Sequence, residues 1–222
     1  MEDFASYGPL SERLLVVGVD GLVGANLALA LSDRAAVLGL CRDQTVELDG
    51  CQTAPWKSTE PSELDAAIRR HQPKWVVYCG PIACSSWDAP ERAFEGVSES
   101  RIVSRLARQC HQAGIALTVV STDAVFAGPR LFHGENDATC NVGPFAQAAL
   151  QVENSLGPAE GLMVRTHAYG WGPLEPEANF ASRVWQSLTE GTCCTLDPHR
   201  YATPILATDL ARFSDRPWLV PC

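Results

Sequence analysis

The chain has 222 residues, of which 46% are hydrophobic and 19% are charged, and its formal net charge is −9. This length predicts one domain with a sizeable core, and the low charged fraction argues against disorder. The acidic balance disfavours nucleic acid as a partner, because proteins that hold a phosphate backbone usually carry a basic patch.

Cysteine usage and the absence of long apolar runs indicate the compartment. The nine cysteines form no C-x-x-C pair and lack zinc-site spacing, so we expect reduced thiols in a cytoplasmic protein. The five histidines are scattered, so no metal is expected. Residues 1–12 are expected to be a flexible N-terminus without a secretory signal, and no apolar run reaches the roughly 18 residues of a membrane span.

Apolar runs alternate with helical patterns along the chain. Strands are predicted at 14–18, 35–41, 74–79, 115–120 and 161–165. Helices are predicted at 23–31, 61–71, 91–113, 145–156 and 180–188, with another starting near 208–212. Fully apolar strands that alternate with helices are typical of a parallel sheet covered on both faces. The pattern therefore predicts an α/β fold, a Rossmann-type doubly wound sheet, with 1–222 as a single domain.

A glycine-rich turn joins the first predicted strand to the first predicted helix. Gly18, Gly21 and Gly24 follow the spacing G-x-x-G-x-x-G, with Leu22 and Val23 between the last two glycines. Glycine allows a tight turn and close approach of a pyrophosphate, which the N–H groups of the helix start can bind. The turn therefore predicts a dinucleotide site. The alternative is a tight strand-to-helix turn that binds no ligand.

The end of the second predicted strand bears on the type of dinucleotide. An acid at this place would bind the ribose 2′-hydroxyl of NAD, but the chain has Cys41 followed by Arg42. Arginine can instead pair with the 2′-phosphate of NADP, so the pattern favours NADP over NAD. The alternative is that Arg42 is a solvated loop residue.

Several motifs resemble the dTDP-4-dehydrorhamnose reductase branch of the extended short-chain dehydrogenases/reductases. The most specific is the run STDAVFAG at 121–128, which is similar to the family signature STDYVFxG. Cys79 and Gly80 end a strand that resembles the floor beside the family's cofactor. Glu153 and the segments 135–137, 164–170 and 203–211 are further landmarks in the family's order. The likeness spans roughly residues 13–212.

The resemblance also implies that catalytic groups are missing. In such enzymes a tyrosine protonates the carbonyl oxygen, a lysine lowers the pKa of that tyrosine, and a serine or threonine hydrogen-bonds the substrate. Thr122 keeps the last role, whereas Phe145 and Ala149 stand at the tyrosine and lysine positions. A positioned general acid contributes about 10²–10⁴-fold in rate, so most carbonyl reduction should be lost. Tyr169 is a conceivable replacement on another loop, and Gly96 corresponds loosely to the family's helical asparagine.

The chain is short for the family, so we expect the substrate lobe to be reduced or missing, with 170–222 as its remnant. The resemblance then implies an NADP-binding homologue that acts as a non-catalytic binding or regulatory protein, as the regulatory subunit of methionine adenosyltransferase does. One alternative is an active nucleotide-sugar reductase with another proton donor, and a second is a scaffold without nucleotide. Trp171 and Trp218 could form an apolar surface for a protein partner or a second copy.

Overall fold

A six-stranded parallel sheet forms the centre of the computed structural model, which describes residues 13–57, 61–88, 96–126, 132–139, 142–157, 160–174, 179–194 and 202–214. Its strands are β1 (Arg13–Val17), β2 (Ala36–Cys41), β3 (Gln52–Pro55), β4 (Trp75–Tyr78), β5 (Ala116–Thr122) and β6 (Leu162–Thr166). They lie in the order β3-β2-β1-β4-β5-β6. This order reverses direction between β1 and β4, as in a doubly wound Rossmann sheet, and confirms the predicted fold class.

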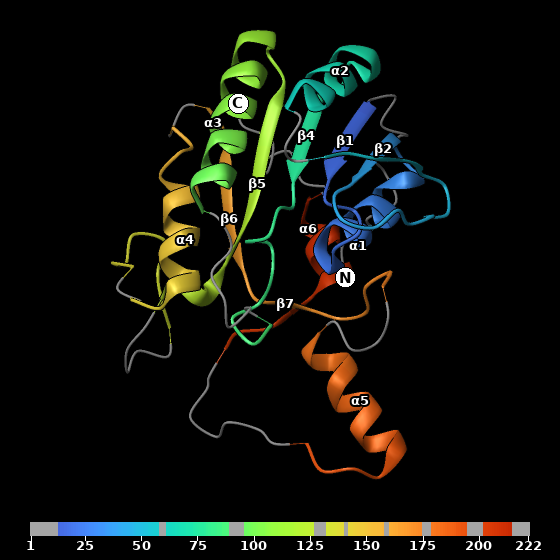
Figure 1. Cartoon of the computed structure of the whole chain (residues 1–222), viewed down its shortest axis with the longest axis vertical. Helices are drawn as coiled ribbons and strands as arrows, with labels where there is room; N and C mark the ends of the chain where they lie inside the picture. Colours follow the sequence, from blue (N-terminus) through green and yellow to red (C-terminus); the bar gives the residue numbers. More distant parts are fainter. Residues whose placement is uncertain are drawn as a thin grey trace, which may run out of the picture.

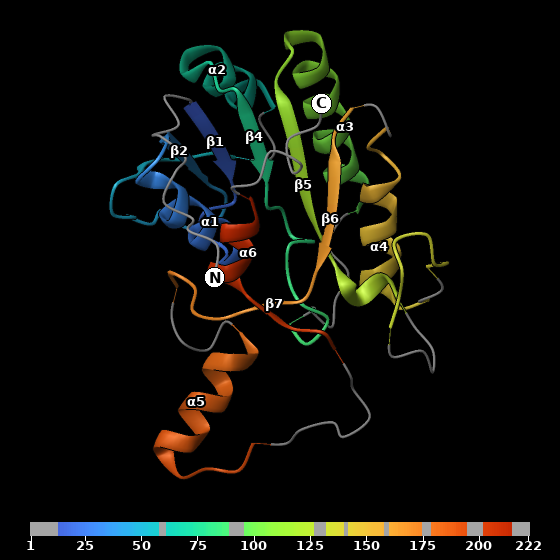
Figure 2. The ribbon, with the colours of Figure 1, turned by 180° about the vertical axis from the view of Figure 1, so that it is seen from behind.

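Helices cover both faces of the sheet (Figures 1 and 2). The helices that do so are α1 (Leu22–Ser32), α2 (Pro61–His71), α3 (Gly96–Ala113), α4 (Pro144–Glu153) and α6 (Ala207–Ser214), whereas α5 (Phe180–Glu190) does not. Buried residues of α2, α3 and α4 join one apolar cluster, and those of α1 and α6 join a second. The sheet therefore lies between two layers of helix.

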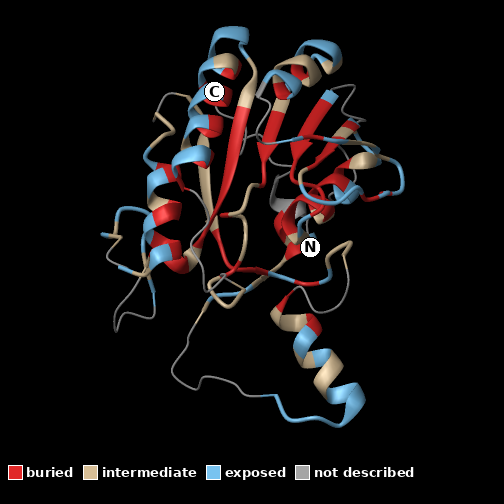
Figure 3. Ribbon diagram, viewed as in Figure 1, coloured by how far each residue is buried: buried red, intermediate tan, exposed pale blue. Residues whose placement is uncertain are grey.

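Strand β1 shows why its sequence is apolar throughout. Leu15 and Val17 belong to the cluster under α2, α3 and α4, whereas Leu14 and Val16 belong to the cluster under α1. Alternate side chains of a strand point to opposite faces, so a strand covered on both sides has no solvent-facing position. Figure 3 shows these central strands as the most continuously buried part of the molecule.

The predicted helices and strands are present, with ends that shift by a few residues; the predicted helical residues 91–95 lie outside the described part. Strand β3 was missed. It is a short edge strand that pairs with β2, none of its residues is fully buried, and it ends at Pro55. Also missed were the short pair β7 (Ala168–Tyr169) and β8 (Ile205–Leu206), and the 3₁₀ turn η2 (Asp123–Val125). Such short elements carry too few residues for a periodic pattern.

Helix α5 stands apart from the sheet, beyond the β7–β8 pair (Figures 1 and 3). Trp185 and Leu188 on this helix are 58% and 73% exposed, and Trp171 lies edge-on to Trp185 with 6.2 Å between ring centroids. Helix α6, by contrast, packs on α1 as part of the sheet body. Trp218 lies outside the described residues. None of the described helices combines the length and apolar character that a membrane crossing needs.

Candidate functional site

The candidate site lies at the carboxyl ends of β1 and β4, where the strand order reverses. The amide of Gly18 donates to the carbonyl of Leu40 at 2.8 Å, and the amide of Cys79 donates to the carbonyl of Val17 at 2.8 Å, so the ends of β1, β2 and β4 stay together. In doubly wound sheets, ligands bind in the crevice outside the carboxyl ends at this switch point. Gly18, Cys79 and Gly80, all predicted from the sequence as cofactor residues, lie at this edge.

The three glycines of the first turn have different physical roles. Gly18 has φ +88°, and a Cβ there would lie 1.9 Å from the carbonyl oxygen of Cys79. A Cβ on Gly24 would lie 2.2 Å from the carbonyl oxygen of Gly18. Gly21 is exposed, and a Cβ on it would meet a single atom, 3.4 Å away. Gly18 and Gly24 are thus required for packing, whereas Gly21 keeps the approach to the turn open.

Helix α1 begins immediately after Gly21, which is its N-cap and provides no side-chain hydrogen bond. Leu22 and Val23 supply the first amides of the helix, and Leu22 is partly exposed. Unpaired amides and the helix dipole make such a start suitable for an anion. The residues present therefore fit the pyrophosphate of a dinucleotide.

A distant loop lies against the same helix start. The side-chain amide of Asn26 donates to the carbonyl oxygen of Trp171 at 2.9 Å, and a Cβ on Gly172 would lie 3.6 Å from the Cα of Leu22. The loop that follows β7 thus borders the glycine turn. Trp171, expected on an exposed apolar surface, is exposed beside this turn.

Asp20, inside the glycine turn, was not identified from the sequence. Its Oδ1 accepts the backbone N–H of Arg42 at 3.0 Å, and its Oδ2 accepts those of Asp43 and Gln44 at 2.7 and 3.2 Å. Asp20 is buried, and three backbone amides of the loop after β2 donate hydrogen bonds to its carboxylate. Because the amides that it binds lie more than twenty residues away in the sequence, no local sequence pattern marks Asp20 as part of the site.

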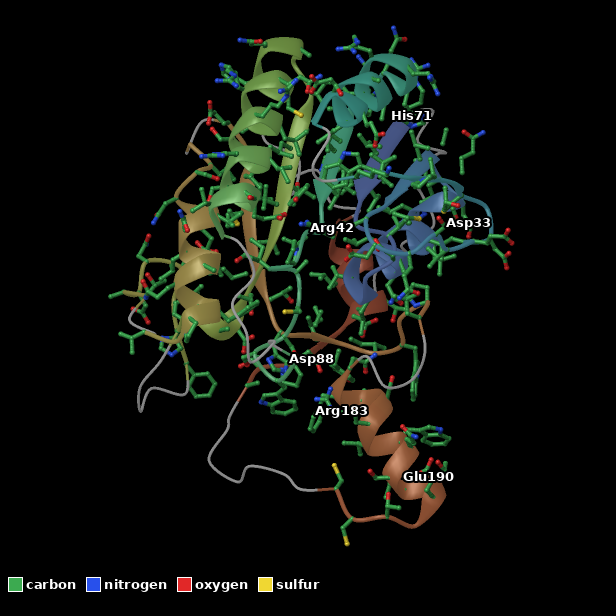
Figure 4. All side chains as sticks on the ribbon, in the orientation of Figure 1. Asp33, Arg42, His71, Asp88, Arg183 and Glu190 are labelled. Carbon is green, nitrogen blue, oxygen red and sulfur yellow. The ribbon has the colours of Figure 1, made fainter. Side chains whose placement is uncertain are left out.

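Arg42, labelled near the centre of Figure 4, was expected to face a 2′-phosphate, but its guanidinium is bound by other side chains of the protein. It donates to both carboxylate oxygens of Glu99 at 2.9 and 2.7 Å, and lies 3.5 Å from the Tyr78 hydroxyl. Burial would lower the pKa of Arg42, but the hydrogen bonds and charge of Glu99 outweigh it and raise that pKa above its ordinary value.

Glu99 also accepts a hydrogen bond from the hydroxyl of Tyr78, the last residue of β4. Burial and the neighbouring Glu99 charge raise the pKa of Tyr78 well above its usual value, so the Tyr78 hydroxyl keeps its proton near neutral pH. A Cβ on Gly80 would lie 2.5 Å from both the Glu99 carboxylate and the Tyr78 ring. Beside it, burial raises the pKa of the Cys79 thiol to about 12, so this thiol stays protonated.

The residues that the family resemblance predicts at the catalytic positions lie on β5 and α4. Thr122 is buried at the end of β5, and its Oγ1 accepts the amide of Ala124 at 3.1 Å, which caps η2. Phe145 is 6% exposed in the first turn of α4, and Ala149, one turn later, is 0% exposed within the apolar cluster. The side chains that the structure places here are thus a hydrocarbon ring and a methyl group.

Gly96, the loose counterpart of the family's asparagine, lies where α3 crosses α4. A Cβ there would lie 3.1 Å from the Cα of Ala148 and 2.8 Å from the side chain of Gln151. A larger side chain would therefore push the two helices apart. The polar side chain of α3 at this edge is Glu99, one turn further along.

Glu153 joins β5, α4 and β6. The Ser121 hydroxyl donates to its Oε1 at 2.6 Å, and Arg165 donates to Oε1 from Nε at 3.1 Å and to Oε2 from Nη2 at 2.8 Å. Glu153 and Ser121 are buried. This part of the family resemblance therefore marks a structural ion pair.

A second polar group missed by sequence reasoning lies after β4, β5 and β6. Asp123 accepts hydrogen bonds from the amide and hydroxyl of Ser86, both at 2.8 Å, and from Nδ1 of His167 at 2.8 Å. Trp87 packs edge-on against the His167 ring, with 4.7 Å between centroids. Nε2 of His167 is buried and has no hydrogen-bond partner among the described residues. Ser86 and His167 come from distant segments, so spacing could not reveal the group.

The Asp123 carboxylate makes stability depend on pH. Burial would raise its pKa, but His167, through a hydrogen bond and its charge, and Ser86 lower the pKa below the usual Asp value. Because the pKa of Asp123 is lower in the folded than in the unfolded protein, its ionised carboxylate stabilises the fold at pH values above the unfolded pKa of about 3.9. This stabilisation is lost as the pH falls through the pKa of the folded state. We expect Asp123→Asn to lower the free energy of unfolding at pH 7 by about 1–3 kcal/mol.

Urea unfolding between pH 7 and pH 2 measures this effect. The variant should show a smaller loss of stability below about pH 4 than the wild type. Asp49→Asn, at an exposed position in the β2–β3 connection, is the control for the change in charge. Equal slopes for Asp123→Asn and wild type would show that Asp123 does not carry the acid sensitivity.

Tyr169, the conceivable replacement acid, lies on β7 and is exposed. Among the described residues, no three His, Cys, Asp or Glu side chains are grouped so that they could hold a metal ion. The polar groups at this edge are therefore Asp20 with the β2 loop, the Arg42–Glu99–Tyr78 group, and the Ser86–Asp123–His167 group.

Comparisons with known proteins agree with this fold. A family model described as the RmlD substrate binding domain matches residues 12–216. A hypothetical dTDP-4-dehydrorhamnose reductase from Sulfolobus tokodaii has a similar solved structure, with TM-score 0.71 and 23% identity; the match covers 90% of this chain and 70% of that one. No curated protein sequence matches the chain.

Two further solved structures contain a dinucleotide. The UDP-glucose 4-epimerase of Thermus thermophilus, in complex with NAD, has TM-score 0.70 and 20% identity, over 90% of this chain and 72% of that one. The Bordetella bronchiseptica enzyme WbmH, in complex with NAD+, has TM-score 0.68 and 16% identity, over 91% and 71%. At such identities the likeness shows the fold.

Proposed function

This chain belongs to the RmlD substrate binding domain family, and from that premise we propose that it binds a nicotinamide dinucleotide without reducing a ketone. The observation that carries the proposal is the pair Phe145 and Ala149 on α4, at the positions where the family resemblance requires a tyrosine and a lysine. A binding or regulatory role is the function that fits a dinucleotide site without this chemistry.

Support for dinucleotide binding comes from the turn after β1. Gly21 is exposed and leaves space above the first amides of α1, where a pyrophosphate would accept hydrogen bonds from Leu22 and Val23. Two structural neighbours are complexes with NAD. The expected preference for NADP rests on Arg42 alone, and Glu99 holds that side chain. When bound, the dinucleotide would supply a hydride donor or acceptor.

Support for the loss of reduction comes from proton supply. A ketone that receives a hydride needs a proton on its oxygen, and Phe145 has none to give. Ala149 is buried among apolar side chains, including Val125 and Val152, so the lysine position offers no charge. Thr122 can still donate a hydrogen bond, but a threonine hydroxyl is too weak an acid to replace a tyrosine with a lowered pKa.

Titration tests the binding half of this proposal. We expect NADH or NADPH fluorescence to change on mixing with the wild-type protein, and Gly21→Asp to weaken the affinity at least about tenfold, because a carboxylate would face the pyrophosphate. Asp49→Asn, distant from the turn in sequence and exposed, should bind as the wild type does. A blank titration with both dinucleotides would instead favour a scaffold that keeps the glycine turn for folding.

A second candidate function, an active nucleotide-sugar reductase with another proton donor, is favoured by one observation. Nδ1 of His167 is hydrogen-bonded to Asp123, and Nε2 has no hydrogen-bond partner in the described part of the protein, so Nε2 is the ring nitrogen available to donate a proton to a substrate oxygen. This candidate requires measurable reduction by the wild type that falls at least about 10²-fold in His167→Asn. It also requires that Phe145→Tyr with Ala149→Lys raises an existing activity.

A further inference from the structure

We propose that Asp20 replaces the acid that the end of β2 lacks, so that the site selects NAD against NADP. The inference rests on the proposed dinucleotide site and deepens it. Cys41 stands at the place of the missing acid, but the carboxylate of Asp20 reaches the same loop from the glycine turn. The Asp20 carboxylate therefore provides the negative charge that an acid at the end of β2 would place beside the adenosine ribose.

The backbone donors after β2 are occupied by this carboxylate. The amides of Arg42, Asp43 and Gln44 point to Asp20 at 2.7–3.2 Å. Without the Asp20 carboxylate, three successive amides that point to one place would form a binding site for a phosphate. With Asp20 in this place, a 2′-phosphate finds no free amide among the three and meets a buried negative charge.

The charge of the ligand decides between the two dinucleotides. A phosphate monoester carries about −1.5 to −2 charges at pH 7, whereas the ribose 2′-hydroxyl of NAD is neutral and can donate a hydrogen bond. A carboxylate has about four lone-pair sites, and Asp20 uses three of them. Oδ1 receives one of these bonds and retains an acceptor site, so Asp20 can accept a hydroxyl while it repels a phosphate.

Arg42 does not offset this repulsion. Its guanidinium makes two hydrogen bonds with Glu99, whose side chain is 2% exposed, and it is itself 18% exposed. To reach a phosphate, Arg42 would have to leave Glu99 as an uncompensated buried charge, which is strongly unfavourable. Arg42, which suggested NADP in the sequence, is therefore bound in an ion pair with Glu99 that supports the fold at this edge of the sheet.

Calorimetric titration of the full chain with NAD and with NADP tests the inference. We expect the wild type to bind NAD at least about tenfold more tightly than NADP. Asp20→Asn keeps the shape of the side chain and removes its charge, so the ratio of the two affinities should fall to within about threefold. The readout is the ratio, because a loosened β2 loop would weaken both ligands alike. Asp49→Asn carries the same change in charge at an exposed position and should keep the wild-type ratio.

Two results would overturn the inference while the proposed function stands: wild-type protein that binds NADP as tightly as NAD, or an unchanged ratio in Asp20→Asn. The wild-type ratio decides the first of these even where the variant fails to fold. If the wild type binds neither dinucleotide, the proposed function fails and this inference fails with it.

Discussion

Gly18→Ala should lower the free energy of unfolding by at least about 3 kcal/mol, a loss found among the most disruptive single substitutions. Two causes act together. Gly18 has φ +88°, a backbone conformation that residues with a Cβ rarely adopt. The Cβ of an alanine at this position would lie 1.9 Å from the backbone oxygen of Cys79. Because that atom belongs to the backbone after β4, relief requires β1 and β4 to separate at their carboxyl ends. Urea unfolding followed by circular dichroism measures the loss.

Gly21→Ala is the matched control for this prediction. Its φ is −90° and its Cβ would meet a single atom at 3.4 Å, so stability should change by no more than about 0.5 kcal/mol. Dinucleotide affinity should nevertheless fall, because the new methyl group would stand at the open side of the turn. A Gly18→Ala protein as stable as Gly21→Ala would contradict the packing role assigned to Gly18.

Glu99→Ala should cost about 3–5 kcal/mol of stability, the range for removing one partner of a buried ion pair. The substitution leaves the Arg42 guanidinium and the Tyr78 hydroxyl without the carboxylate that binds both. It also opens space beside Gly80, whose Cα faces the Glu99 carboxylate. Chemical unfolding at pH 7 checks the magnitude, and Glu99→Gln, which keeps a hydrogen-bond acceptor, should lose less.

The exposed pair of Asp65 and Arg105 provides the comparison for Glu99. It also joins an acid to an arginine across two helices, but the Arg105 side chain is 45% exposed. Solvent screens such pairs, so Asp65→Ala should lose much less stability than Glu99→Ala. Should both alanine variants lose the same stability, the Arg42–Glu99–Tyr78 group would not be the support of this edge that its burial indicates.

The fold was predictable because β1 and its neighbours are buried on both faces. Runs such as Leu14 to Val17 have no polar position, and the helices between the strands are long enough to show their own period. Strand β3 could not be predicted in the same way, since its residues are half-exposed and Pro55 ends it. For β7 and β8, two residues each, pairing arises from the tertiary fold.

At the candidate site, the tight turn from Gly18 to Gly24 between a strand and a helix was predictable, because its residues are neighbours in sequence. The site was not predictable where the partners come from separate segments. Asp20 acts through amides after β2, Arg42 through Glu99 on α3, and His167 through Asp123. The sequence shows the charge of Arg42 but not that Glu99 binds it. The preference for NADP that was inferred from Arg42 therefore depended on a contact that the sequence does not show.

The proposed function is that this protein binds a dinucleotide but cannot protonate a ketone. Its most direct test is a single-turnover experiment, in which wild-type protein with bound NADH or NADPH receives an excess of a 4-keto nucleotide sugar. We predict that the absorbance of the reduced nicotinamide persists and that no alcohol product forms. Consumption of one equivalent of the reduced dinucleotide, with the matching alcohol product, would contradict the account.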